Sequence, residues 1–144
     1  MAVGLSLSIT IELDASRVKI WDAITNPEII KQYLFGTETV SQWKVGSSIV
    51  FKGIWEGVDY IDKGTILELI PEQKLKYDYL SSFSRLEDKP ENYQQITFDL
   101  ETNNGKSLLT LTQENIPNET SKEHSKNNWT SILNHIKQIV EDKK

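Results

Sequence analysis

The chain has 144 residues and a formal net charge of −5; 38% of its residues are hydrophobic and 26% are charged. This balance is typical of one soluble globular domain, which we expect to span residues 1–144 and to lie in the cytoplasm. A nucleic-acid surface is not expected, because no basic cluster is available for phosphates, and the lack of cysteine excludes disulfides and thiolate chemistry. No apolar run approaches the roughly 20 residues that span a bilayer, so we expect neither membrane insertion nor a signal peptide.

The first predicted elements are a strand and a short helix. Over residues 5–13, leucine and isoleucine alternate with polar residues, and this period of two is that of a strand with one buried face. Asp14 or Ser16 can cap the helix that follows. Its apolar residues recur at helical spacing and are expected to face the core: Val18, Trp21 and Ala23 or Ile24.

A second short helix is predicted directly after the first. Asn26-Pro27 ends the first helix, and a proline fits the first turn of the next one because its missing N–H would have no partner there. Gly36 marks the end of this second helix. Its apolar residues are Ile29, Ile30, Tyr33 and Leu34.

Strands separated by turns are predicted over residues 36–114. The clearest turn is Asn104-Gly105, a pair typical of two-residue hairpins. Gly64 lies inside a long strand pattern and indicates a bulge or a sharp bend, and the polar segment 81–92 is expected to form a mobile loop. The predicted strands are 39–43, 48–55, 58–70, 74–79, 93–102 and 108–114.

One long helix is predicted from about Glu119 onward. Its apolar residues form a single stripe in the second half: Trp129, Ile132, Leu133, Ile136, Ile139 and Val140. The same face of the first half carries only polar residues, namely Ser121, Lys122 and Ser125. We therefore expect burial to anchor the second half, while the first half covers a rim or faces solvent.

The order of these elements predicts an α+β fold. Serial strands joined by hairpin turns favour a curved antiparallel sheet of six to seven strands. The apolar stripe of the long helix must be buried, and the concave face of that sheet is the surface available to it. The two short helices follow the first strand.

Four stretches of the sequence resemble a known family. They are 15–25 (ASRVKIWDAIT), 43–46 (WKVG), 64–79 (GTILELIPEQKLKYDY) and 128–133 (NWTSIL). Together with the order of elements, they resemble the activator of Hsp90 ATPase homologue family, which belongs to the START/Bet v 1-like helix-grip superfamily. The resemblance covers residues 8–141, nearly the whole chain.

The resemblance implies a fold and says little about activity. It implies a seven-stranded type of antiparallel sheet that clasps the long helix, with an apolar cavity between them. The family's motifs belong to the scaffold, so no catalytic residue carries over, and a chaperone is an implied possible partner. The sequence departs from the family pattern at Ser47, Tyr79 and Asn128, where the family usually has glycine, tryptophan and glycine.

Aromatic residues occur on almost every predicted element, and several share one face of a strand. If those faces point inward, they line a cavity suited to a small apolar or amphipathic ligand, and tyrosine hydroxyls would orient its polar end. The alternative is that the same side chains simply fill the core. The predicted cavity residues are Tyr33, Phe35, Phe51, Trp55, Tyr60, Tyr77, Tyr79, Phe98, Trp129 and Leu133.

The titratable residues predict no catalytic centre. His124 and His135 lie about 16 Å apart along the predicted helix, too far to share a metal ion, and we expect no metal and no cofactor. Glu68 and Asp78 would be acid–base candidates if they faced inward, but an outward orientation is expected. The acidic residues within 56–62 are expected to be solvated near a turn.

Three functions remain open at this level. The first is a binding module for a small apolar or amphipathic ligand, monomeric or weakly dimeric and without defined catalytic activity. The second is an enzyme on the same scaffold, such as a cyclase or hydrolase of a hydrophobic substrate, which requires an inward-facing titratable group. The third is a chaperone-related interaction domain, which requires an exposed apolar patch outside the cavity.

Overall fold

The computed structural model describes residues 4–34, 36–81 and 86–141. In chain order, its elements are β1 (Leu5–Leu13), α1 (Arg17–Thr25), α2 (Pro27–Tyr33), β2 (Glu38–Ser41), β3 (Ser48–Trp55), β4 (Val58–Ile70), β5 (Lys74–Tyr79), the 3-10 turn η1 (Pro90–Asn92), β6 (Gln94–Asn103), β7 (Lys106–Ile116) and α3 (Glu119–Glu141). Strands β1, β3, β4 and β5 have the predicted bounds. Strand β2 ends earlier than predicted, since Trp43 adopts a left-handed backbone conformation with a φ of 55°. Of the loop predicted at 81–92, residues 82–85 lie outside the described residues.

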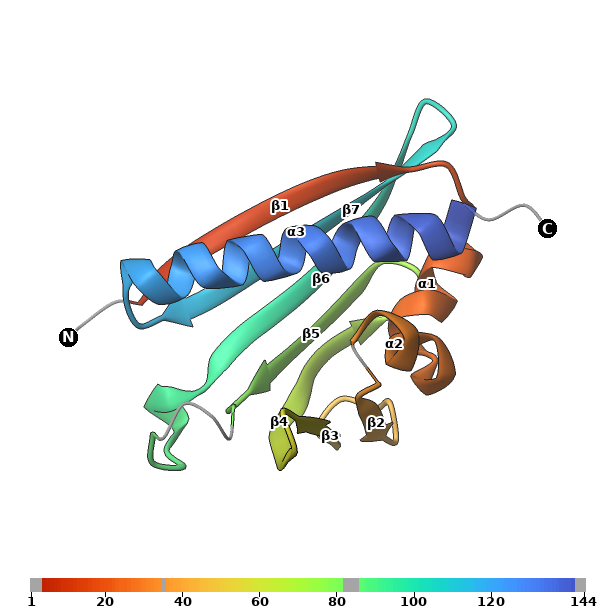
Figure 1. Cartoon of the computed structure of the whole chain (residues 1–144). Helices are drawn as coiled ribbons and strands as arrows, with labels where there is room; N and C mark the ends of the chain where they lie inside the picture. Colours follow the sequence, from red (N-terminus) through yellow and green to blue (C-terminus); the bar gives the residue numbers. More distant parts are fainter. Residues whose placement is uncertain (1–3, 35, 82–85, 142–144) are drawn as a thin grey trace.

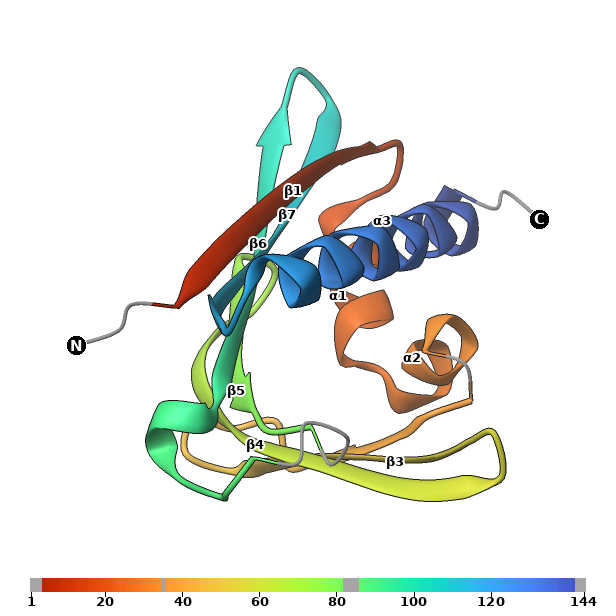
Figure 2. The ribbon, with the colours of Figure 1, turned by 60° about the vertical axis from the view of Figure 1, so that its left-hand side comes forward.

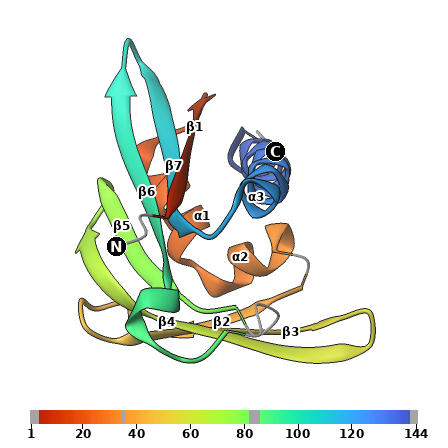
Figure 3. The same ribbon diagram turned by 90° about the vertical axis from the view of Figure 1, so that its left-hand side faces the viewer.

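The seven strands form one antiparallel sheet in the order β1-β7-β6-β5-β4-β3-β2. Strands β2 to β7 are neighbours in sequence order, as the hairpin turns predict, and β1 pairs with β7. Helix α3 runs along the concave face, and α1 and α2 lie beside it (Figure 1, Figure 2). A view along α3 shows the sheet curving around all three helices (Figure 3). The predicted α+β helix-grip architecture is confirmed.

The apolar stripe of α3 holds the helix against the sheet. Its buried residues are Ile132, Leu133, Ile136 and Val140, and Trp129 and Ile139 pack partly buried against the same core. No residue of α3 between 119 and 128 is buried. At the opposite end of the helix, a carboxylate oxygen of Glu141 accepts a hydrogen bond of 2.8 Å from the backbone N–H of Asp14. The second half of α3 is therefore anchored, as predicted, and the first half is not.

Helix α1 begins after Ser16 and buries one of its faces. The Ser16 hydroxyl accepts a hydrogen bond of 3.2 Å from the backbone N–H of Lys19, and so Ser16 is the cap. The residues of α1 that face the core are Ile20, Ala23 and Ile24. Val18 is 64% exposed, so its predicted inward position is wrong. It lies about 200° around the helix from Ile20 and points away from the core.

Gly64 lies where β4 leaves β3 and joins β5. A Cβ added to Gly64 would overlap the carbonyl oxygen of Asp78 and would lie 2.6 Å from the Asp78 carbonyl carbon. The irregularity predicted for β4 is present, although the shift in register lies slightly later, between Ile66 and Glu68. The glycine is therefore needed for the close approach of two strands at the point where the sheet bends.

Candidate ligand-binding cavity

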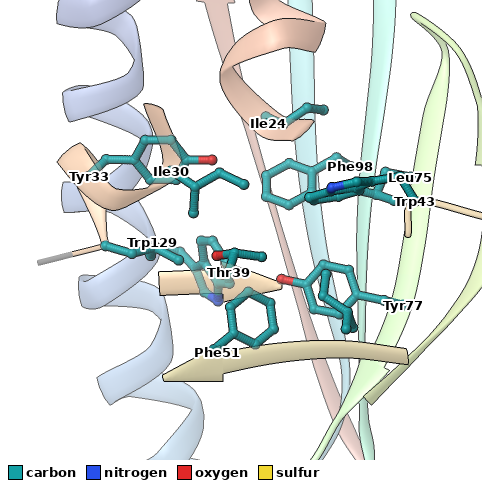
Figure 4. A pocket seen from close by; sticks show the side chains of 12 residues that line it. Ile24, Ile30, Tyr33, Thr39, Trp43, Phe51, Leu75, Tyr77, Phe98 and Trp129 are labelled. Carbon is teal, nitrogen blue, oxygen red and sulfur yellow. The ribbon is translucent and has the colours of Figure 1, made fainter. Parts of the chain in front are cut away.

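An apolar cavity lies between α2, the strands β2, β3, β5 and β6, and the middle of α3. Its lining comprises Ile24, Ile30, Tyr33, Leu34, Thr39, Trp43, Ile49, Phe51, Leu75, Tyr77, Phe98 and Trp129 (Figure 4). The cavity volume is about 20 Å³, which is room for one water-sized group. The aromatic side chains thus fill most of the space between helix and sheet.

Two pairs of aromatic rings form the walls of this cavity. The rings of Phe51 and Tyr77 have centroids 5.6 Å apart at a tilt of 44°. The rings of Phe98 and Trp129 meet edge to face, with centroids 5.9 Å apart and an interplanar angle of 80°. Both separations are typical of favourable aromatic pairs. The second pair connects the sheet to α3, so any motion of the Trp129 ring away from the sheet must break it.

Half of the predicted cavity residues line the cavity: Tyr33, Phe51, Tyr77, Phe98 and Trp129. Leu133 is buried in the core but does not contribute to the lining, and neither do the half-buried Tyr60 and Tyr79. Phe35 and the side chain of Trp55 lie outside the described residues. Their predicted place in the cavity therefore stays a prediction.

Tyr60 lies on the β3–β4 hairpin, outside the cavity lining, and makes contacts that hold the hairpin in place. Its ring lies over Gly53, where a Cβ would come 2.6 Å from the ring carbon that bears the hydroxyl. The Tyr60 hydroxyl makes a short hydrogen bond with the hydroxyl of Thr37. These contacts tie the hairpin to Thr37, which lies three residues after Leu34 of the cavity lining.

Three hydroxyl groups belong to the cavity lining. The Tyr33 hydroxyl donates a hydrogen bond of 2.9 Å to the backbone carbonyl of Ala23. The Thr39 hydroxyl is buried, and its oxygen has no hydrogen-bond partner in the part of the chain that the structure describes. Burial raises the pKa of Tyr33 and of Tyr77 well above the usual value. The tyrosine hydroxyls are therefore neutral at physiological pH and can act as donors or acceptors.

Gln113 on β7 is a buried polar residue that the sequence analysis did not single out. It is 1% exposed, and its side-chain oxygen accepts a hydrogen bond of 2.8 Å from the indole N–H of Trp129. Its side-chain N–H group donates to the side-chain oxygen of Gln94. Gln113 occupies an inward position in the alternating pattern of β7, and a polar residue at such a position is the signal that could have revealed it. It fixes the orientation of the tryptophan that closes the cavity.

Replacing Gln113 with leucine is expected to lower the free energy of unfolding by about 1–3 kcal/mol, because the indole N–H and the Gln94 amide lose their partner. Replacing Trp129 with phenylalanine in the same chain should recover part of this loss, with a coupling energy of about 1 kcal/mol. Urea denaturation of the single and double variants measures both quantities. Gln95→Leu, on the opposite face of β6, is the matched control and should change stability by less than about 0.5 kcal/mol. Additive effects of the two substitutions would show that the hydrogen bond does not hold Trp129.

The candidate acids and histidines lie away from the cavity. His124 and His135 are exposed on α3. Glu68 lies 4.0 Å from the Lys76 ammonium group, and a carboxylate oxygen of Asp78 accepts a hydrogen bond of 2.8 Å from the backbone N–H of Thr65. The outward orientation expected for both acids is confirmed, because they lie on β4 and β5 in register opposite to the inward residues. Within residues 4–34, 36–81 and 86–141, no group of three or more histidine, aspartate or glutamate side chains is placed to hold a metal ion.

Tyr79 should make stability depend on pH in the alkaline range. Burial and the nearby Asp62 carboxylate raise the pKa of Tyr79 to about 12 in the folded protein, against about 10 in an unfolded chain. A raised pKa favours the native state fully below about pH 10, and this contribution is lost as the pH rises towards 12. As the pH rises from about 10 to about 12, the Tyr79→Phe variant should therefore lose less stability than the original chain. Thermal melting of both proteins at neutral pH and across this range checks the prediction. An equal fall of Tm with pH in the two proteins would contradict it.

Comparison with known proteins gives the family of the chain. The model of the family described as "Activator of Hsp90 ATPase homolog 1-like protein" matches residues 14–141. The chain belongs to this family. No curated protein matches it significantly, and no helix within the described ranges is long and apolar enough to cross a membrane. The family resemblance seen in the sequence is confirmed.

Three solved structures of this fold are similar to the chain. The protein ChR145 from Cytophaga hutchinsonii is 40% identical, with a TM-score of 0.85 over 98% of this chain and 97% of that one. The Aha1 dimer from Colwellia psychrerythraea is 22% identical, with a TM-score of 0.76 over 97% and 98%. PFC0360w, an HSP90 activator from Plasmodium falciparum, is also 22% identical, with a TM-score of 0.74 over 94% and 96%. The last two likenesses show the fold alone.

Proposed function

We propose that the protein is a binding module for a small apolar or amphipathic molecule, held between the sheet and the C-terminal helix. The observation that carries this proposal is the lining of the cavity, which is largely aromatic. The lining also contains the hydroxyl of Thr39, which has no hydrogen-bond partner among the described residues. If the side chain at position 39 served only to fill the core, valine would be favoured there, because a buried hydroxyl without a hydrogen bond is destabilising. Burial of ligand surface against the aromatic walls would provide most of the affinity, at roughly 25 cal/mol per Å².

A ligand of ordinary size has to displace side chains, because such sites usually measure about 300–1,000 Å³ and this cavity measures about 20 Å³. Trp129 is the residue of α3 that lines the cavity, and it lies next to the half of the helix that can move most easily. That half buries no residue between 119 and 128, and Trp129 is the first residue of the helix that packs against the core. We infer that the ligand enters beside Trp129, with that ring turning away from Phe98.

Thermal melting with a panel of lipids, sterols and aromatic polyketides tests the proposal, alongside native mass spectrometry of molecules that remain bound after purification. A ligand present at about 100 times its Kd stabilises the folded state by about 2.7 kcal/mol, which corresponds to a rise in Tm of roughly 5–10 °C for a chain of this size. No shift with any member of the panel, together with no retained molecule, would contradict the proposal.

A cavity-filling variant provides the matched control. Ile30→Phe adds volume inside the cavity, since Ile30 is 4% exposed and belongs to the lining. It should abolish the ligand-induced rise in Tm at a cost of about 1–3 kcal/mol in stability. Val18→Phe adds the same aromatic ring on the exposed side of α1 and should leave the rise unchanged. Equal responses of the two variants would show that the ligand binds elsewhere.

The convex face of the sheet supports a second candidate function, that of a chaperone-related interaction domain. Val40, Ile54 and Ile61 are 45%, 67% and 58% exposed. They lie on β2, β3 and β4, and the register of these strands places all three on the face opposite to Phe51. Exposed apolar side chains grouped in this way are typical of interaction surfaces. An HSP90 activator shares the fold, so Hsp90 is the first partner to test.

The test of this second function uses purified Hsp90 and its rate of ATP hydrolysis. If the convex face binds the chaperone, the protein should change that rate, and the double variant Ile54→Lys/Ile61→Lys should lose the effect. Val18→Lys introduces the same charge on an exposed position of α1 and should keep the effect. An unchanged rate at saturating concentrations of the protein would exclude this function for the chaperone tested.

A further inference from the structure

We propose that Thr39 and Tyr77 form a polar subsite inside the cavity, which hydrogen bonds one uncharged oxygen group of the ligand, either a hydroxyl or a carbonyl. This inference rests on the proposed binding function and concerns the chemical class of its ligand. The two residues come from different parts of the sheet, β2 and β5, and both line the cavity (Figure 4).

The hydroxyl of Thr39 is the first observation. Thr39 is 3% exposed, and no described residue hydrogen bonds to its oxygen. Two other buried hydroxyls are paired: Ser107 donates to the backbone carbonyl of Ala15 at 2.9 Å, and Thr37 donates to that of Leu34 at 2.5 Å. Because buried polar groups are nearly always paired, an unpaired one that faces a cavity indicates a partner supplied by a ligand.

The hydroxyl of Tyr77 is the second observation. Tyr77 is 7% exposed, its ring packs on Phe51, and its hydroxyl points into the cavity (Figure 4). Among residues with described side chains, none forms a hydrogen bond with this hydroxyl. Tyr33 differs, because its hydroxyl donates to the Ala23 carbonyl and has no proton left to offer. Tyr77 therefore remains available as a donor.

The arrangement of the strands places the two hydroxyls around a single ring. Thr39 pairs with Phe51 across β2 and β3, and the Phe51 ring contacts the Tyr77 ring. The cavity that both residues line has a volume of about 20 Å³, which admits one oxygen-sized group. An oxygen there can accept a hydrogen bond from Tyr77 and either donate to Thr39 or accept from it, which suits a hydroxyl and also a carbonyl.

A charged ligand group is disfavoured at the subsite. The lining contains no arginine, lysine, histidine, aspartate or glutamate among the described residues. A buried ion without a counter-ion is strongly destabilised. Burial also keeps Tyr33 and Tyr77 protonated, because it raises the pKa of both groups. The surroundings therefore discriminate against carboxylate and ammonium ends and favour a neutral one.

Three probes that differ in a single substituent test the subsite: β-naphthol, β-methylnaphthalene and β-naphthoate. They carry a hydroxyl, a methyl and a carboxylate on the same bicyclic ring. Fluorescence titration should give β-naphthol roughly fivefold tighter binding than β-methylnaphthalene, as expected for one net hydrogen bond, and much weaker binding of β-naphthoate. The double variant Thr39→Val/Tyr77→Phe should lose this preference for β-naphthol. Equal binding of these two probes by the original chain would overturn the subsite and leave the binding function in place.

A measurement without any ligand separates the subsite from the binding function. Thr39→Val keeps the shape of the side chain and removes the unpaired hydroxyl, so it should raise Tm by about 2–4 °C. Thr37→Val makes the same change at a buried hydroxyl that is paired, so it should lower Tm by a similar amount. A fall in Tm for both variants would overturn the subsite. If none of the three probes binds to the original chain, the subsite is contradicted, whereas the proposed binding function fails only if the ligand panel and the search for retained molecules are negative as well.

Discussion

Replacing Gly64 with alanine is expected to reduce the free energy of unfolding by more than about 4 kcal/mol, a large part of the roughly 5–15 kcal/mol of a typical domain. The added Cβ would overlap the carbonyl oxygen of Asp78 and lie 3.0 Å from the Cα of Tyr79. Both atoms belong to the backbone of β5, so no side-chain rotation can relieve the clash. Strands β4 and β5 would have to separate at the bend that gives the sheet its concave face.

Urea denaturation followed by circular dichroism measures this effect, and Gly57→Ala is the control. Gly57 lies in the β3–β4 turn with a φ of 80°, and no other residue of the described chain lies within 4 Å of an added Cβ. Its substitution should cost only about 1–2 kcal/mol, which is the strain of a left-handed alanine. A loss at Gly64 no greater than that at Gly57 would show that the strands do not approach as closely as the structure indicates.

Truncation of Ile136 to alanine should lower the free energy of unfolding by about 2–5 kcal/mol. Ile136 is 0% exposed and lies at the centre of the stripe with which α3 packs against the sheet. Removing three of its side-chain carbons leaves a space that the neighbouring strands can close only in part. The same substitution would also loosen the part of α3 that follows the cavity.

Two substitutions in α3 provide controls for this result. His135→Ala, at the next residue, changes an exposed side chain and should alter stability by less than about 0.5 kcal/mol. Ser125→Ala lies on the same face of the helix as the stripe but in the half that buries no residue, and it should be similarly mild. Comparable losses for Ile136→Ala and His135→Ala would mean that the stripe does not dock on the concave face.

Much of the fold could be predicted because its signals are local. The alternation in β1 and the apolar stripe of α3 each arise from the period of one element, independent of its neighbours. The turns are local as well: Glu56-Gly57 and Asn104-Gly105 have positive φ values at both residues, as two-residue hairpin turns require. This explains why the predicted bounds of several strands agree with the structure to the residue.

The cavity was predicted less completely, because a lining depends on which residues meet across strands. Phe51 and Tyr77 are buried, so the faces of β3 and β5 that carry them point inward. The remaining space, however, depends on how tightly neighbouring side chains interdigitate, and a core packed to the density of an organic crystal leaves little of it. The alternation of a single strand cannot show that aromatic rings reduce the opening to about 20 Å³.

The sequence by itself determined the kind and order of the helices and strands, and the family to which the chain belongs. Only the tertiary structure decided which buried polar atoms find a partner: Gln113 meets Trp129 across the gap between sheet and helix, while the Thr39 hydroxyl meets no described residue. The physical reason is that periodicity is a property of one segment, whereas hydrogen-bond pairing and cavity volume depend on the register between segments far apart in the chain.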